Sequence, residues 1–354
     1  MSWFNKWGGQ SNVVGLDMGS HTLKLASLIP KKSSFVLDAL HTVSLPHGTI
    51  VDGDILDSLT LEKGIQELFS NEKKGSKSIA FAVSGSAVFS KKITIPFLSE
   101  KELEDQLPVI AAQYVPFPIE EANMDYQLLS PLQDKTQELD LVITAVKKKF
   151  LENYVSLLKT CNLKPAVVDT VATALANTFS LAYPNQKSAV LIHIGACLTQ
   201  IVVIEKGVPV FSDAISAGGN NISYNIREKL KLSFQEADAL KINCTKDQHL
   251  PEETMVAVKE ACDHLYNDIQ LSLNSYVRQF PQSHIEAIYL SGGSAKIVPL
   301  IEWLSNSLSL KVSYLNPWNF ISYDPKKFRQ SELEELSLMM PVALGLASRS
   351  KAHD

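Results

Sequence analysis

VVGLDMGSHTLKL, residues 13–25, is the most informative stretch of this chain. An apolar run enters an Asp-x-Gly-Ser turn and leaves it with the alternating pattern of a β-strand. Because glycine has no Cβ, the backbone N–H groups of Gly19 and Ser20 can approach an anion closely, as in a phosphate-binding loop. An ordinary hairpin turn uses the same residue types, since Asp and Ser bond their own backbone. The stretch alone leaves both interpretations open.

A second copy of this unit follows about half a chain later. AVLIHIGACLT (189–199) and QIVVIEKGVPVF (200–211) give an apolar strand, a turn at Gly195, a hydroxyl residue at Thr199 and two more strands. Two copies of one supersecondary unit predict a duplicated α/β fold with a cleft between its halves.

A third stretch, AIYLSGGSAKIVPL (287–300), supplies another strand and turn. Its strand runs into Gly292 and Gly293, followed by Ser294. Pro299 is expected in the early turns of the helix that begins there, because proline needs no backbone donor at a helix start.

In this order the three stretches resemble the two phosphate loops and the adenosine loop of the actin-like ATPase superfamily, whose fold is a duplicated, ribonuclease H-like one. Nearly the whole chain resembles the PilM family, the actin-like proteins of type IV pilus assembly that are grouped with FtsA. The stretches that carry this closer resemblance are KKITIPFLSEKELEDQL (91–107), AAQYVPFPIEEANMDYQLL (111–129), PAVVDTVATAL (165–175) and PVALGLASR (341–349).

The resemblance implies two actin-like lobes and one inserted subdomain. The expected parts are an N-terminal stub (1–11), a first lobe (12–90 and 147–185, with a C-terminal helix at 331–350), an inserted subdomain (91–146) and a second lobe (186–330). Aromatic residues in the stub could dip into a membrane interface, although packing on the first lobe or lack of order would also suit so short a segment.

One helix of the insertion has a clear start signal. Ser99 and Glu102 have the spacing of a capping box, which satisfies two backbone donors at a helix start. Pro108 lies further along the same apolar periodicity, so we expect the helix to bend or restart there.

Composition excludes several classes of protein. The 354 residues carry a net charge of -5, which offers no basic face for nucleic acid. The longest apolar runs fall short of the roughly 18 residues that a membrane span needs, and no signal-peptide core is present. Four isolated cysteines predict buried thiols in a reducing compartment. We expect a cytoplasmic protein that does not span the membrane.

The expected ligand is ATP or ADP, bound between the lobes. In the loop ISAGGNNIS (215–223), a glycine pair can expose backbone donors at a helix start. The resemblance also implies that Asp238 and Lys241 reach the ribose and base, whereas the plain alternative is a solvated i, i+3 pair. Lys24 could lie along the cleft or face solvent. The expected nucleotide-binding residues are Asp17, Gly19, Ser20, Lys24, Gly195, Thr199, Gly218, Gly219, Asp238, Lys241, Gly292, Gly293 and Ser294.

The metal site departs from the family pattern. The resemblance implies two carboxylates, one from each phosphate loop, that hold hydrated Mg²⁺ through its waters. Asp17 fills the first position, but His193 stands at the second, and imidazole is a poor Mg²⁺ partner. We therefore expect weakened Mg²⁺ affinity. A buried strand histidine bonded to the backbone is the alternative for His193.

Hydrolysis is expected to be slow or absent. Many relatives carry a Glu at or near the position of Val171, and valine can neither orient water nor take a proton. Asp169 is the remaining candidate base beside Asp17.

The resemblance implies a scaffold that binds the N-terminal cytoplasmic tail of a PilN-like inner-membrane protein on its first lobe, at the cytoplasmic side of the inner membrane and within reach of pilus motor ATPases. One alternative is an actin-like filament protein. FtsA-like relatives end in an amphipathic membrane helix, whereas this chain ends in SRSKAHD. A sugar or acid kinase is a third possibility, but no cluster of Asn, Asp and Glu suited to a sugar is evident.

Overall fold

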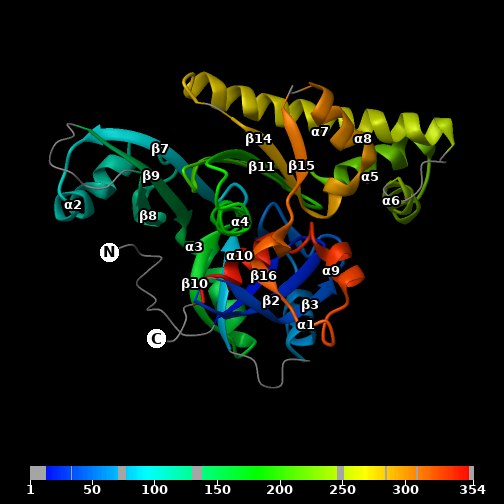
Figure 1. Cartoon of the computed structure of the whole chain (residues 1–354), viewed down its shortest axis with the longest axis horizontal. Helices are drawn as coiled ribbons and strands as arrows, with labels where there is room; N and C mark the ends of the chain where they lie inside the picture. The colour runs from blue at the N-terminus through cyan, green and yellow to red at the C-terminus, as the bar shows by residue number, and fades with distance from the viewer. Residues whose placement is uncertain are drawn as a thin grey trace.

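The computed structural model describes residues 13–32, 34–70, 77–129, 138–244, 251–283, 285–307 and 310–350. The stub predicted for residues 1–11 lies outside them. Figure 1 shows two sheet-based halves, with helices α4 (Val171–Ala182) and α10 (Pro341–Ala347) between them.

The first sheet has the order β10-β6-β1-β2-β3-β16. Strands β1, β2 and β3 form an antiparallel meander, and β6 and β10 add to the other side of β1 in parallel. The strands are β1 (Val14–Met18), β2 (Thr22–Pro30), β3 (Phe35–Ser44), β6 (Ser78–Val83), β10 (Lys164–Thr170) and β16 (Ile321–Ser322).

The second sheet repeats this topology in the order β13-β12-β11-β14-β15. Again three antiparallel strands are followed by two parallel ones. The strands are β11 (Ser188–Ile194), β12 (Thr199–Glu205), β13 (Val208–Ile215), β14 (Ala287–Ser291) and β15 (Lys311–Tyr314). The duplicated actin-like α/β fold predicted from the sequence is therefore confirmed.

Helices cover both faces of each sheet, which is why the central strands read as continuous apolar runs. On the first sheet, α1 (Ser58–Ser70) and α3 (Lys148–Thr160) cover one face, and α4 and α10 cover the other. On the second sheet, α5 (Gly219–Leu230), α7 (Glu252–Gln279) and α8 (Val298–Ser307) share the core of one face, and α4 packs on the other. The short α6 (Phe234–Asn243) follows α5.

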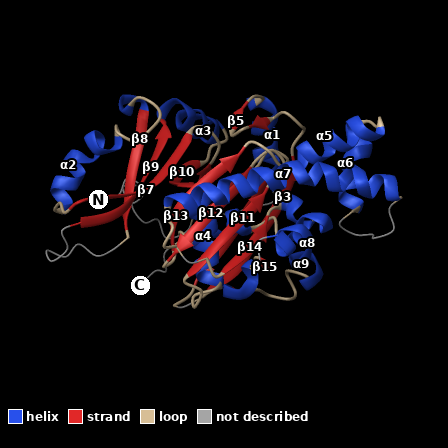
Figure 2. Ribbon diagram, turned by 90° about the horizontal axis from the view of Figure 1, so that it is seen from above, coloured by secondary structure: helices blue, strands red, loops and turns tan. Residues whose placement is uncertain are grey.

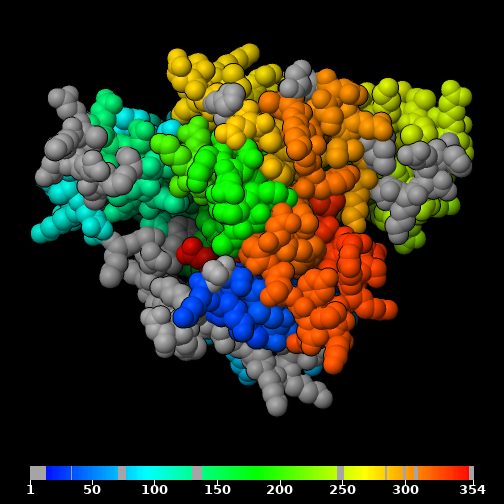
Figure 3. All heavy atoms as spheres, viewed as in Figure 1, coloured from blue at the N-terminus to red at the C-terminus, as the bar shows by residue number. Residues whose placement is uncertain are grey.

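Two glycines let α10 pack closely in the middle of the molecule. A Cβ on Gly15 would lie 2.1 Å from the backbone oxygen of Ala343, and one on Gly345 would lie 1.9 Å from the backbone oxygen of Ala174. In Figure 3 the last described residues, in red, lie beside the blue N-terminal strands. Ser350 Oγ bonds both the N–H and the carbonyl of Val13, at 3.1 Å each.

The insertion forms its own three-stranded sheet with the order β7-β9-β8 and a separate core. Its elements are β7 (Val88–Pro96), α2 (Glu100–Ala111), β8 (Ala122–Leu128) and β9 (Glu138–Lys147). Figure 2 shows β7 next to β13 of the second sheet. An ion pair of 3.4 Å between Lys92 and Glu205 joins the two regions.

The structure corrects three predictions. Helix α2 has the predicted capping box at Ser99, but it continues through Pro108 as one helix. Pro108 lies in the last turn, so its missing donor removes support only near the helix end. The single helix predicted for 331–350 is two helices, α9 (Gln330–Leu336) and α10, because Pro341 starts a new one. The second lobe predicted for 186–330 ends too late, because β16 pairs with β3 of the first sheet.

Candidate functional site

A pocket of about 380 Å³ opens where the two sheets face each other. The turns that end β1 and β11 form part of its wall, together with α5, α6, the segment after β14 and the segment between α9 and α10. Nine of the predicted nucleotide-binding residues line it: Asp17, Gly19, Ser20, Lys24, Gly195, Asp238, Lys241, Gly293 and Ser294.

The other four predicted residues shape the wall from behind. Thr199 is fully buried, and its hydroxyl donates to the Ala217 carbonyl at 2.8 Å rather than pointing into the pocket. Gly218 and Gly219 start α5, and the Gly219 N–H donates to the Gly195 carbonyl at 3.0 Å.

The fourth, Gly292, needs to be glycine for two reasons. Its φ is +92°, a left-handed conformation that side chains disfavour, and a Cβ there would lie 2.2 Å from the Ile194 carbonyl oxygen. Its N–H donates to the Leu338 carbonyl at 2.6 Å. The turn at Gly292 is thereby fixed against the end of β11 and against the C-terminal segment.

On the first sheet, the pocket floor carries an ion pair. Asp17 and Lys24 lie opposite each other on β1 and β2, and their charged atoms are 2.9 Å apart. Both residues are buried, so Lys24 lies along the cleft rather than in solvent. The ammonium also donates to the Thr22 carbonyl at 3.3 Å. A Cβ on Gly19 would lie 3.1 Å from this ammonium, which places the cation beside the turn that follows β1.

On the second sheet, the equivalent positions hold a histidine and an amide. His193 on β11 lies opposite Gln200 on β12, as Asp17 lies opposite Lys24. His193 Nδ1 is 2.9 Å from the Ser291 hydroxyl, so its partner is a side chain and not the backbone. Burial lowers the pKa of His193 to about 4, although the charge of Asp17 opposes this shift. The imidazole is therefore neutral at physiological pH.

These residues do not fit a protein-held Mg²⁺ site. The carboxylate of Asp17 already pairs with an ammonium, and a neutral imidazole replaces the second carboxylate. Within the part of the chain that the structure describes, no group of three or more His, Cys, Asp and Glu residues could hold a metal ion. Mg²⁺ prefers carboxylate oxygens and waters.

Asp169, the other candidate base, does not line the pocket. It is buried on β10, and its Oδ2 is 3.5 Å from Arg349 Nε but has no hydrogen-bond partner. Burial raises the pKa of Asp169 to about 6, with Arg349 acting against the shift and Asp125 adding to it. Val171 does line the pocket. The pocket wall at Val171 is therefore apolar and offers no general base.

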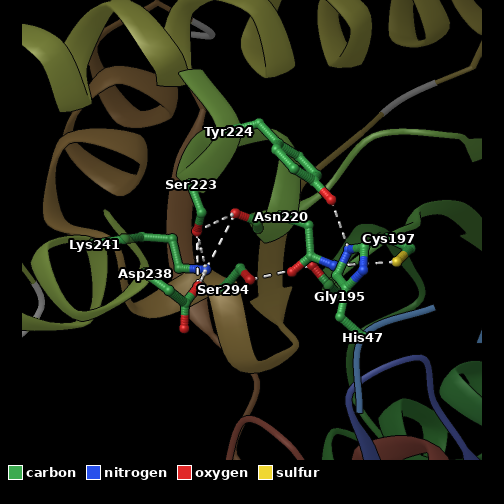
Figure 4. Close-up of polar contacts among 10 residues, drawn as sticks. His47, Gly195, Cys197, Asn220, Ser223, Tyr224, Asp238, Lys241 and Ser294 are labelled. Carbon is green, nitrogen blue, oxygen red and sulfur yellow. Dashed lines mark hydrogen bonds and ion pairs between the residues drawn. The ribbon is translucent and has the colours of Figure 1, made fainter. Parts of the chain in front are cut away.

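On the side of the pocket formed by α5 and α6 lies a buried polar network (Figure 4). Lys241 donates to the Gly219 carbonyl at 3.1 Å, to Ser223 at 2.9 Å and to Asp238 at 2.5 Å. Ser223 donates to Asp238 at 2.7 Å. Although burial alone would raise the pKa of Asp238, hydrogen bonds from Lys241 and Ser223 hold it below its ordinary value. Lys241 is only 8% exposed, so a solvated surface pair is the wrong interpretation.

Next to this network, a group of three rings connects the two lobes. His47 follows β3 in the first lobe, and its Nε2 is 3.0 Å from the Tyr224 hydroxyl on α5 (Figure 4). The His47 ring also lies 5.3 Å from the ring of Phe234 on α6. A second link joins Ser216 to Asp52 at 3.0 Å.

Sequence reasoning missed several lining residues. Gln200 could have been found by aligning the second unit with the first, where it takes the place of Lys24. Tyr154 lines the pocket and donates to the Gly53 carbonyl at 2.5 Å. Leu336 and Met339 also line it, but no local signal marks them, because they arrive from the C-terminal segment.

Comparisons with known proteins agree with this architecture. A family model described as "Type IV pilus assembly protein PilM" matches residues 15–351. The solved structure of a "PilM-PilN type IV pilus biogenesis complex" superimposes with a TM-score of 0.84 at 25% identity, covering 96% of this chain and 98% of that one. MreB5 of Spiroplasma citri bound to ADP gives a TM-score of 0.52 at 14% identity, covering 95% of each chain, which shows the fold alone.

A curated relative is more distant. The cell division protein FtsA of Staphylococcus epidermidis is 23% identical over 201 residues, which cover 51% of this chain and 43% of FtsA. The match therefore spans less than half of that relative's length. Among the described residues, no helix combines the length and the apolar character that a membrane crossing requires.

Proposed function

The chain belongs to the type IV pilus assembly protein PilM family, and we propose that it acts there as a scaffold that binds ATP or ADP between its lobes. One observation carries this proposal: two glycine turns, one from each copy of the duplicated unit, line the same inter-lobe pocket. A pocket of about 380 Å³ with a few polar groups in an otherwise apolar wall suits a small ligand of this kind.

Polar groups from both lobes line the pocket. Gly19, Ser20 and Gly195 can present backbone donors to phosphates, with the Lys24 ammonium beside them. Asp238 and Lys241 line the pocket from α6, where we propose that they face the ribose and base. MreB5, which shares the fold, was solved with ADP. The pocket's chemistry favours a nucleotide in a fixed orientation.

The same groups are poorly suited to hydrolysis. Val171 is apolar, Asp169 is directed to Arg349, and His193 is bonded to Ser291. A general base must lie within hydrogen-bond reach of the proton that it takes. We therefore propose that the nucleotide fixes the arrangement of the lobes and is turned over slowly or not at all.

The proposed partner is the N-terminal cytoplasmic tail of a PilN-like inner-membrane protein, which would hold the chain at the cytoplasmic face of the membrane. Support comes from the PilM-PilN complex, whose PilM-like fold covers almost the whole chain. On the insertion, Lys91 lies 5.0 Å from the ring of Tyr114, and Lys147 lies 5.6 Å from the ring of Phe117. Aromatic and basic groups side by side suit an amphipathic peptide.

Thermal melting with ATP and ADP tests the nucleotide part of this proposal. A ligand that binds only the native state raises the melting temperature as its concentration rises. We expect a concentration-dependent increase with either nucleotide and none with a free sugar. Gly195→Val should abolish the increase, because a side chain there meets the Leu198 carbonyl 2.8 Å from its Cβ. No shift with any nucleotide would contradict the proposal.

Titration with a synthetic PilN-like tail tests the partner part. We expect binding that Tyr114→Ala and Phe117→Ala weaken about tenfold, since apolar anchors carry much of the affinity for a peptide. Tyr314→Ala is the matched control, because that ring is exposed on the second sheet. Equal affinity for all variants would remove the insertion from the proposed contact.

A further inference from the structure

We infer that the pocket takes its nucleotide without a divalent cation held by the protein, because the residues at the expected metal site do not suit one. This inference rests on the proposed function and specifies its ligand: the nucleotide free of metal. It follows from the residues at equivalent positions of the two sheets.

The duplication puts Asp17 and His193 in corresponding places. Each lies on the first strand of its sheet, just before the glycine turn, and each faces the second strand in the same register. Side chains alternate along a strand, so His193 shares its face with Leu191, and Asp17 shares its face with Gly15. These are the faces that α4 and α10 cover between the sheets. The two side chains thus approach the pocket from opposite sides.

The charges at these positions leave little to attract a metal ion. Asp17 forms an ion pair with Lys24 at 2.9 Å, whereas the side chains of His193 and Gln200 carry no carboxylate. Gln200 is occupied, since its amide donates to the Asp213 carbonyl at 2.9 Å. A hydrated Mg²⁺ bound here would have one shared carboxylate and would lie near an ammonium that repels it.

In place of a metal ion, Lys24 can bring a positive charge to the phosphates. Its ammonium has three donors, of which Asp17 and the Thr22 carbonyl use two. It also lies beside Gly19, at the turn where the phosphates are expected. A compact ammonium is a common phosphate ligand because it acts as a point charge.

The experiment compares ATP affinity in excess EDTA with ATP affinity in excess Mg²⁺, by isothermal titration of the wild-type chain. We expect dissociation constants that agree within about twofold, because no protein group holds the metal. ATP binding that appears only with Mg²⁺ overturns this inference and leaves the proposed function intact. No binding in either buffer overturns the proposed function, and the inference with it.

Two substitutions at the same position make the test sharper. His193→Asp restores a second carboxylate, so Mg²⁺ should then tighten ATP binding by about tenfold relative to EDTA. His193→Asn has a similar size without the charge and should stay insensitive to the metal. Melting of both variants without ligand establishes that they fold. Equal responses of the two variants to Mg²⁺ would overturn the inference, and so would an Mg²⁺ requirement in His193→Asn.

Discussion

The first five strands of each sheet have the same order, and their first two strands pair in the same register, yet the sheets differ where their first strands end. In the first sheet Asp17 faces Lys24, and in the second His193 faces Gln200. One pair is ionic and the other is neutral. The fold needs apolar strands and a glycine turn at this place, but it does not need a particular polar pair. The chemistry of one lobe can therefore diverge while the architecture of both is kept.

A second difference lies deeper in the same strands. The register places Gly15 of β1 opposite Ala26, and Leu191 of β11 opposite Val202, so these two residues correspond. Gly15 leaves room for α10, whereas Leu191 fills the space against α4. The first sheet therefore packs closely against α10, a helix from the far end of the chain. Among the described residues, no helix approaches Leu191 of the second sheet in the same way.

The largest loss of stability should come from filling the space that Gly15 leaves for α10. Gly15→Ala would put a Cβ 2.1 Å from the Ala343 carbonyl oxygen and 2.6 Å from the Ala347 nitrogen. Since both are backbone atoms that cannot turn away, we expect a loss of more than about 4 kcal/mol in the free energy of unfolding. Urea denaturation measures it. Gly293→Ala, whose Cβ meets only Met339 at 3.9 Å, is the control and should stay near the wild type.

The next effect separates the two polar pairs. Lys24→Met leaves Asp17 buried without its cation, which should cost about 3 kcal/mol in the free energy of unfolding. Gln200→Met removes only a neutral amide and should cost about 1 kcal/mol. The double variant Asp17→Asn with Lys24→Met should regain much of the free energy of unfolding that Lys24→Met loses, as denaturation of both proteins would show. If both single variants lose the same stability, the ionic pair is not the distinguishing feature of the first lobe.

A pH series tests the neutral state of His193. Its pKa of about 4 lies below the ordinary 6.5, so between these values the unfolded chain binds the extra proton. Stability from this group is complete above about pH 6.5 and falls as the pH drops toward 4. Between about pH 7 and pH 5, the free energy of unfolding of the wild type should thus fall by up to about 2 kcal/mol relative to that of His193→Asn. Denaturation of both proteins at each pH gives this difference.

Asp169 should respond in the opposite direction over the same range. Its pKa is raised to about 6 from 3.8, so the folded chain binds the extra proton, and this group favours folding more as the pH falls through 6. Relative to Asp169→Asn, the wild type should therefore gain stability on acidification. The two groups partly cancel in the wild type, which is why each variant is compared with it separately. If the stability of a variant changes with pH in parallel with that of the wild type, the pKa shift of the replaced residue is contradicted.

The smallest effect concerns the rings that link the lobes. His47→Ala removes a hydrogen bond to Tyr224 and ring contacts with Phe234. Because His47 is exposed, we expect about 1 kcal/mol in stability and a few-fold faster nucleotide dissociation, measured by stopped flow. Tyr224→Phe keeps the ring and loses the hydrogen bond, so its effect should be smaller. An unchanged dissociation rate in His47→Ala would show that the link does not restrain the lobes.

Much of the fold could be predicted from the sequence because its signals are local. The apolar runs, the turns at Gly19 and Gly195 and the capping box at Ser99 each depend on neighbouring residues. Predictions failed where a distant segment decides the outcome. The pairing of β16 with β3 joins strands that are far apart in the sequence, and no local pattern announces it.

The candidate site shows the same limit. The residues on the glycine turns were predicted, since a turn that can hold a phosphate has a recognisable composition. The placement of Asp169 was not, because its ion pair with Arg349 depends on the C-terminal segment. The wall formed by Leu336 and Met339 depends on the same segment. Duplication offered one unused signal: aligning the two units assigns Gln200 to the place of Lys24.

A crystal structure of the chain grown with ATP in excess EDTA tests whether the pocket holds a metal-free nucleotide. We expect one nucleotide between the lobes, with its phosphates against the turns of Gly19 and Gly195 and its ribose toward Asp238. The Lys24 ammonium should lie within hydrogen-bond distance of a phosphate oxygen. A nucleotide bound anywhere else, or phosphates that leave Lys24 on Asp17 alone, would contradict it.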